Sequence, residues 1–116
     1  MRGLSVVSND VAWVSGSAGH IGKTLDGGKT WEWQQPKGYE KLDFRDIEAF
    51  DEKNAIAVNA GSPAFIIRTN DGGKSWQEVY KNTDSLIFLD GMDFWDPMHG
   101  IIFGDPIKNK MQLLKT

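Results

Sequence analysis

Apolar and polar positions alternate along this chain in short runs that suit β-strands rather than helices. In the middle of the chain, four such runs cover residues 46–51, 54–60, 64–69 and 76–80, with turn-forming residues between them. The same order recurs on both sides, at 3–8, 11–17, 20–25 and 31–35, and then at 91–96, 100–105 and 111–116. No window keeps a helical period over about ten residues. The pattern therefore predicts an all-β protein built from units of up to four short antiparallel strands.

The units repeat in sequence as well as in pattern. The segment TLDGGKTW at 24–31 returns as TNDGGKSW at 69–76, an offset of 45 residues, and the pair GS at 16–17 returns at 61–62 with the same offset. A third copy, GIIFGDPIKNKMQLLKT, ends at Thr116, where a third such turn would begin. Four short strands about every 45 residues are typical of a β-propeller blade.

We therefore predict a partial β-propeller over residues 1–116. Its expected parts are blade 1 at about 2–35, blade 2 at about 44–80 and an incomplete blade 3 at about 88–116. Because propellers close with roughly four to eight blades, two and a half blades indicate a fragment of a larger propeller. Such a fragment leaves strand edges and blade faces uncovered, so self-association through these edges is expected.

Composition supports this fold and narrows the function. The chain has 13 glycines among 116 residues and five tryptophans, which suits tight turns and a core filled by large rings. A net charge of −3 without a basic run gives no footprint for nucleic acid. No apolar stretch reaches membrane-spanning length, so membrane insertion is not expected. The chain has no cysteine, which excludes disulfides and cysteine zinc sites.

The repeated turn has a structural chemistry. Asp26 and Asp71 are placed to accept hydrogen bonds from the backbone N–H groups that follow them. The glycine pairs next to them supply positive φ angles at little steric cost. A tryptophan then opens the fourth strand and can bury its ring against neighbouring strands. The residues with these expected structural roles are Thr24, Asp26, Gly28, Thr30, Trp31, Thr69, Asp71, Gly73, Ser75 and Trp76.

Both segments match the Asp-box pattern S/T-x-D-x-G-x-S/T-W at every defined position. The chain therefore resembles Asp-box (BNR) repeat β-propellers, a superfamily that includes sialidases. The DGGK[ST]W form and the spacing of the units are most similar to the photosystem II assembly-factor-like group and its uncharacterised bacterial relatives. This resemblance implies that the Asp-boxes lie at the blade periphery, away from the functional mouth. It also implies an extracytoplasmic location, periplasmic or secreted.

Other candidate sites in the sequence are weaker. Gly22-Lys23-Thr24 looks like the end of a phosphate loop, but position 17 is serine where a glycine is required, and the Asp-box turn prevents a helix. His20 and His99 are predicted on loops of different blades without a third nitrogen or sulfur ligand, so no metal and no cofactor are expected. Four acidic residues could be considered as calcium ligands but are expected to be solvated turn residues: Asp90, Asp93, Asp96 and Asp105. Three tryptophans are expected to pack within and between blades: Trp13, Trp33 and Trp95.

Blade geometry places the candidate binding face opposite the Asp-boxes. Antiparallel strands bring the second-to-third loops and the links between blades to the same end, which carries 15–20, 59–64, 104–110 and the links 35–46 and 81–90. Alignment of the units puts Arg2, Arg45 and Asp90 at one equivalent position, where each innermost strand starts. The candidate binding residues on this face are Arg2, Arg45, Asn59, Ser62, Asp90 and Asp105.

Three functions follow from these features. The first is a non-catalytic binding or assembly propeller with a protein or carbohydrate ligand on this face, as the resemblance implies. The second is a sialidase-like glycoside hydrolase whose catalytic residues lie largely in further blades. That family implies three arginines around a carboxylate, whereas Arg68 is predicted beside an Asp-box, away from Arg2 and Arg45. The third is a fragment without separable activity.

Overall fold

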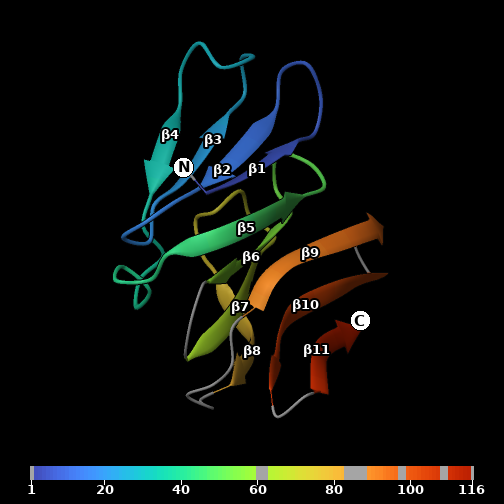
Figure 1. Cartoon of the computed structure of the whole chain (residues 1–116). Coiled ribbons are helices and arrows are strands. Elements are labelled where there is room, and N and C mark those ends of the chain that lie inside the picture. Colours follow the sequence, from blue (N-terminus) through green and yellow to red (C-terminus); the bar gives the residue numbers. More distant parts are fainter. Residues whose placement is uncertain (1, 60–62, 83–88, 97–98, 108–109, 116) are drawn as a thin grey trace.

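The computed structural model describes residues 2–59, 63–82, 89–96, 99–107 and 110–115, with side chains beyond residue 81 described only at Met92, Phe94 and His99. These ranges contain strands and no helix, and thus no membrane-spanning helix. The strands form two four-stranded sheets and one three-stranded sheet, each antiparallel (Figure 1). The predicted all-β fold of four-stranded units is therefore confirmed.

The first sheet contains β1 Gly3–Val6, β2 Ala12–Ser15, β3 Ile21–Thr24 and β4 Glu32–Gln34. The second contains β5 Phe44–Ala49, β6 Ala55–Asn59, β7 Ala64–Thr69 and β8 Gln77–Asn82. The third contains β9 Leu89–Asp96, β10 His99–Ile107 and β11 Lys110–Lys115. Most strand ends lie within two residues of the ends predicted from the sequence.

Strand register defines which positions correspond between the first two sheets. Thr24 of the first Asp-box pairs with Ala12, and Thr69 of the second pairs with Ala55. Corresponding positions of β3 and β7 are therefore 45 residues apart, whereas those of β2 and β6 are 43 residues apart. The difference lies in one connection: five residues separate the paired Ser15 and Ile21, whereas seven separate Val58 and Ile66. The second GS pair, at 61–62, lies outside the described residues, so its correspondence with the pair at 16–17 stays a prediction.

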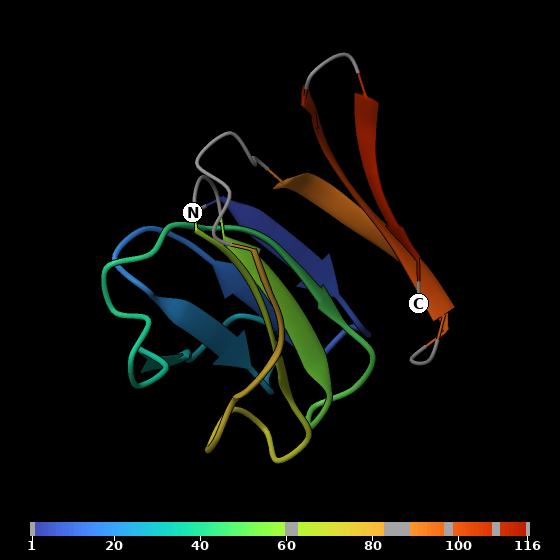
Figure 2. The same cartoon turned by 90° about the horizontal axis from the view of Figure 1, so that it is seen from below.

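Successive sheets pack face to face, with β1 next to β5 and β5 next to β9, so that the three sheets fan out in chain order (Figure 2). One core cluster lies between the first and second sheets and another between the second and third. Alternation along each strand supplies both faces of the middle sheet with apolar side chains. The first cluster contains Trp13, Ile21, Phe44, Ile47, Ala55, Ala57 and Ile67, and the second contains Ile56, Val58, Ala64, Ile66 and Met92.

Candidate functional site

The two Asp-box turns have the same hydrogen-bond network. In the first, the Asp26 carboxylate accepts bonds from the Thr30 amide at 2.9 Å and the Thr30 hydroxyl at 2.6 Å. In the second, Asp71 accepts the same two bonds from Ser75 at 2.9 and 2.5 Å. The leading threonine hydroxyl donates to the aspartate and accepts from the second glycine N–H in each turn. All four turn glycines have positive φ, so the predicted geometry of the turn is observed.

These bonds shift the aspartates toward the charged form. The Ser75 hydroxyl and amide, followed by the Thr69 hydroxyl, lower the pKa of Asp71 to about 2. The Thr30 hydroxyl and amide lower the pKa of Asp26 in the same way. Hydrogen bonds to a carboxylate favour its ionised form. Both carboxylates are thus occupied in holding their turns, and neither is set up as a proton donor at neutral pH.

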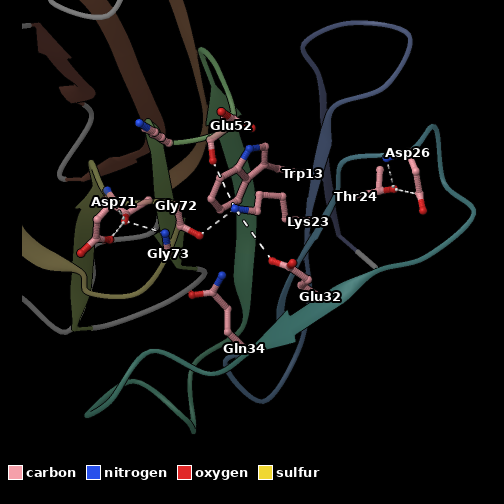
Figure 3. A network of polar contacts seen from close by, with 12 residues as sticks. Trp13, Lys23, Thr24, Asp26, Glu32, Gln34, Glu52, Asp71, Gly72 and Gly73 are labelled. Carbon is pink, nitrogen blue, oxygen red and sulfur yellow. Dashed lines mark hydrogen bonds and ion pairs between the residues drawn. The ribbon is translucent and has the colours of Figure 1, made fainter.

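The second Asp-box also binds the first sheet, through Lys23 (Figure 3). The Lys23 ammonium donates to the carbonyl oxygens of Glu52 at 3.2 Å and Gly72 at 3.1 Å, and lies 5.2 Å from the centre of the Trp13 ring. Glu32 adds an ion pair at 3.9 Å from an exposed side chain. Lys23 is itself almost fully buried. Burying an ammonium group is costly unless it is paired, so these acceptors make Lys23 a specific link between sheets.

The tryptophans of the two motifs have different surroundings. Trp76 meets Trp13 edge to face at 6.2 Å, and its indole N–H donates to the Gln34 side chain at 2.9 Å. Trp31 stacks on Trp33 at 6.2 Å, and Trp33 is largely exposed. The same motif position therefore contributes to an interface between sheets in one case and lies beside an open sheet face in the other.

At the opposite end of the sheets, the loop 16–20 is joined to the link between the first two sheets. The Gly19 amide donates to Leu42 at 2.6 Å, the Phe44 amide donates to Gly16 at 2.9 Å, and the Gln35 side chain donates to Ala18 at 2.8 Å. A Cβ atom at Gly19 would lie 2.6 Å from the Tyr39 carbonyl oxygen, so only glycine allows this approach. The bonds give this face a defined backbone surface.

Arg2 and Arg45 correspond by register on this face, but Arg2 lies just before β1, whereas Arg45 lies within β5 at a register shift between Phe44 and Asp46. Arg2 comes directly before Gly3, which pairs with Ser15 of β2. Arg45 comes directly before Asp46, which pairs with Val58 at the corresponding position of β6. The Arg2 guanidinium lies 3.8 Å from the Asp43 carboxylate, and both side chains are nearly half exposed. The Asp46 carboxylate accepts a bond from the Met92 amide at 3.0 Å and so connects β5 with β9. The sequence interpretation missed Asp43, because its link to Arg2 depends on the path between the blades.

Of the other four candidates, only the Asn59 side chain is described, and it does not face a ligand surface. Asn59 is buried, where its side chain donates to the Pro63 carbonyl at 2.9 Å and accepts from the Phe65 amide at 2.5 Å, so it shapes its own loop. Ser62 lies outside the described residues. Asp90 lies on β9 and Asp105 on β10, but their side chains are outside the described part.

A second group on this end was not predicted. The Tyr39 hydroxyl donates to the Glu78 carboxylate at 3.2 Å, and its ring meets Phe65 edge to face at 5.5 Å. Lys81 lies over the Phe65 ring at 5.5 Å. Burial, followed by the negative charge of Glu78, raises the pKa of Tyr39. Tyr39 belongs to a link whose spacing does not repeat, so sequence alignment of the blades gave no signal for it.

Catalytic and metal-binding arrangements receive no support from the described residues. Within those ranges no group of three or more His or acidic side chains could hold a metal ion. The His20 Nδ1 atom lies 3.0 Å from the Ser17 carbonyl oxygen, within its own loop. Arg68 pairs with Ile56 next to the Asp-box, at the opposite end of the second sheet from Arg45. The part of the chain that the structure describes therefore does not bring three arginines together.

Comparisons with known proteins agree with the fold. The family described as "Photosynthesis system II assembly factor YCF48" matches residues 2–86. Among solved structures, YCF48 bound to D1 peptide matches with a TM-score of 0.71 and 17% identity, over 97% of this chain and 39% of that one. YCF48 from Cyanidioschyzon merolae matches with a TM-score of 0.65 and 20% identity, over 96% of this chain and 38% of that one. No curated protein matches. The chain thus spans less than half the length of these similar structures.

Proposed function

Because the chain belongs to the family of the photosynthesis system II assembly factor YCF48, we propose that it is part of a binding propeller of the assembly-factor type. Its ligand is a segment of a protein partner, held on the face opposite the Asp-boxes. A solved structure of similar fold is YCF48 bound to D1 peptide, which supports a peptide as the class of ligand.

The observation that carries this proposal is an arginine directly before each of two residues that correspond in register, Gly3 of β1 and Asp46 of β5. Arginine binds carboxylates through two parallel hydrogen bonds. The contact between Arg2 and Asp43 is long, at 3.8 Å, and open to solvent, so it contributes little to stability and can be exchanged. A carboxylate of a bound peptide would replace Asp43 as the partner of Arg2. The Tyr39–Phe65 pair offers an apolar contact on the same end of the second sheet.

Peptide binding by the arginines can be tested with the labelled D1 peptide and fluorescence anisotropy. We expect the double variant Arg2→Ala, Arg45→Ala to bind about a hundredfold more weakly or worse, since each lost charged hydrogen bond contributes roughly 1.5–3 kcal/mol. Lys29→Ala is the matched control, because Lys29 is exposed on the first Asp-box turn at the other end of the sheet. Equal binding by both variants would move the site elsewhere. A chain that bound neither this peptide nor any segment in an array of acidic peptides would refute the function.

No contact among the described residues favours a carbohydrate ligand or a glycosidase over a peptide-binding protein. The glycosidase prediction depends on arginines that the described sheets hold apart, because Arg68 lies at the Asp-box end. We therefore propose a peptide ligand and a non-catalytic role. Self-association of the chain through exposed blade edges is a separate prediction.

A further inference from the structure

Four side chains gather where the link between the first two sheets meets the second sheet, and we call them the tyrosine patch: Tyr39, Phe65, Glu78 and Lys81. Tyr39 belongs to the link between β4 and β5, whereas the other three belong to β7 and β8. The Tyr39 hydroxyl donates to Glu78, and the Lys81 ammonium lies over the Phe65 ring. The patch therefore combines two aromatic rings with two hydrogen-bond donors, one of them charged.

A bulge in β8 brings Lys81 to this side of the second sheet. Val79 has no partner in the register of β8 with β7, where the pairing shifts by one residue. Alternation alone would place Glu78 and Lys81, three positions apart, on opposite faces. The extra residue returns Lys81 to the face of Glu78, opposite Phe65 on β7. Bulges re-aim side chains and are over-represented beside functional sites, so the direction of Lys81 points to a role in binding.

The backbone of the link fixes the position of Tyr39. The Tyr39 amide donates to the carbonyl oxygen of the buried Pro36 at 3.0 Å, and the Tyr39 carbonyl oxygen accepts from the Leu42 amide at 3.1 Å. Gly19 of the first sheet approaches the same carbonyl oxygen closely. The ring and hydroxyl of Tyr39 are thus held in place before a ligand arrives, which lowers the entropic cost of binding.

The two donors of the patch are available to an incoming acid. Among the described residues, no carboxylate forms an ion pair with Lys81, which is exposed. The Tyr39 hydroxyl has Glu78 as its acceptor at 3.2 Å, which is long for a bond between two oxygen atoms. Glu78 is also exposed, so this bond contributes little to stability and can be exchanged.

We propose that the tyrosine patch binds an acidic side chain of the peptide ligand. The ligand carboxylate accepts bonds from the Lys81 ammonium and the Tyr39 hydroxyl, and it displaces Glu78 as the acceptor of that hydroxyl. Glu78 therefore competes with the ligand and repels it by like charge. This inference rests on the proposed function, because it names a second contact of the same ligand. Its residues differ from the two arginines, so the two contacts can be tested separately.

Paired peptides test the contact with Lys81. The labelled D1 peptide is varied to carry glutamate or glutamine at each position in turn, and fluorescence anisotropy compares the two peptides of each pair. We expect at least one position where the wild-type chain binds glutamate about threefold more tightly, and Lys81→Ala should remove that preference. Lys74→Ala is the matched control, because Lys74 is exposed on the second Asp-box turn, at the other end of the sheet. If no glutamate preference depended on Lys81, the proposal would be wrong.

A gain of affinity tests the competition by Glu78. Glu78→Gln should bind that glutamate peptide about threefold more tightly, whereas a merely structural role of Glu78 would give a loss. Glu52→Gln makes the same change in net charge at the Asp-box end and should bind like the wild type. Circular dichroism and thermal melting establish that the variants fold. Equal or weaker binding by Glu78→Gln would overturn the displacement step.

The two proposals fail in different ways. Wild-type binding that depends on Arg2 and Arg45 but not on Lys81 would refute the tyrosine patch alone. A wild-type chain that bound none of the peptides would refute the proposed function and this inference together.

Discussion

The two Asp-box units share their turns and differ in their surroundings. The four corresponding hydrogen bonds of the two turns, donated by threonine, serine or glycine of the motif, agree in length within 0.1 Å. Trp76 nevertheless lies between two sheets, while Trp31 stacks on Trp33, which is largely exposed. The Gly72 carbonyl oxygen accepts a hydrogen bond from the buried Lys23, whereas the corresponding Gly27 carbonyl oxygen accepts none from a described side chain. The turn is thus a local structure, and its role in joining blades depends on the neighbouring sheet.

The largest difference between the units is expected at the tryptophans. Trp76→Ala should lower the free energy of unfolding by about 3 kcal/mol, because it empties a site between sheets and removes the partner of Gln34. Trp31→Ala should cost about 1 kcal/mol, since its ring has neighbours on fewer sides. Urea denaturation of both variants measures the comparison. Equal losses would mean that each ring stabilises only its own turn.

The lysine link should give the next largest effect. Lys23→Met keeps most of the buried volume but leaves the Glu52 and Gly72 carbonyl oxygens without their donor, so we expect a loss of about 1–3 kcal/mol in the same denaturation experiment. Lys29→Met, on the exposed turn of the first Asp-box, should change stability little. If Lys23→Met left the free energy of unfolding unchanged, methionine packing would replace the hydrogen bonds, and the lysine link would not stabilise the interface.

The smallest difference is expected between the aspartates, since their turns are alike. The folded-state pKa of Asp71 is about 2, below its ordinary 3.8, so its charge contributes stability above about pH 4 that is lost as the pH falls toward 2. The stability gap between wild type and Asp71→Asn should therefore narrow over this range. Thermal melting at several pH values should show the same trend for Asp26→Asn. Asp10→Asn, on an exposed turn, provides the control; a gap for Asp71→Asn that was constant with pH would contradict the role of its charge.

Local interactions explain how much of the fold was predictable from the sequence. The Asp26–Thr30 and Asp71–Ser75 bonds span four residues each, so residue types and spacing were enough to predict both turns. The strands followed from alternation of apolar positions. By contrast, Lys23 and its acceptor Gly72 are 49 residues apart, and nothing in either segment alone reveals the contact.

The candidate site was predictable only in part. Arg2 and Arg45 correspond by register, as the alignment of the units indicated, but their role in binding stays a prediction. Asn59 was chosen because its loop is on the binding face, yet its side chain is directed into that loop. The contacts of Asp43 and Tyr39 could not be foreseen, because the link between the blades follows no repeat.

The sequence by itself determined the strands, the two Asp-box turns and the propeller type, because these depend on contacts within a few residues and on a period that is visible in the chain. Only the tertiary structure decided which faces of the sheets are covered. It showed that equivalent motif positions, Trp31 and Trp76, have different neighbours. It also revealed that the paired Val58 and Ile66 are separated by two more residues than the paired Ser15 and Ile21. The physical reason is that burial belongs to pairs of surfaces, and a repeat specifies each surface without specifying what lies against it.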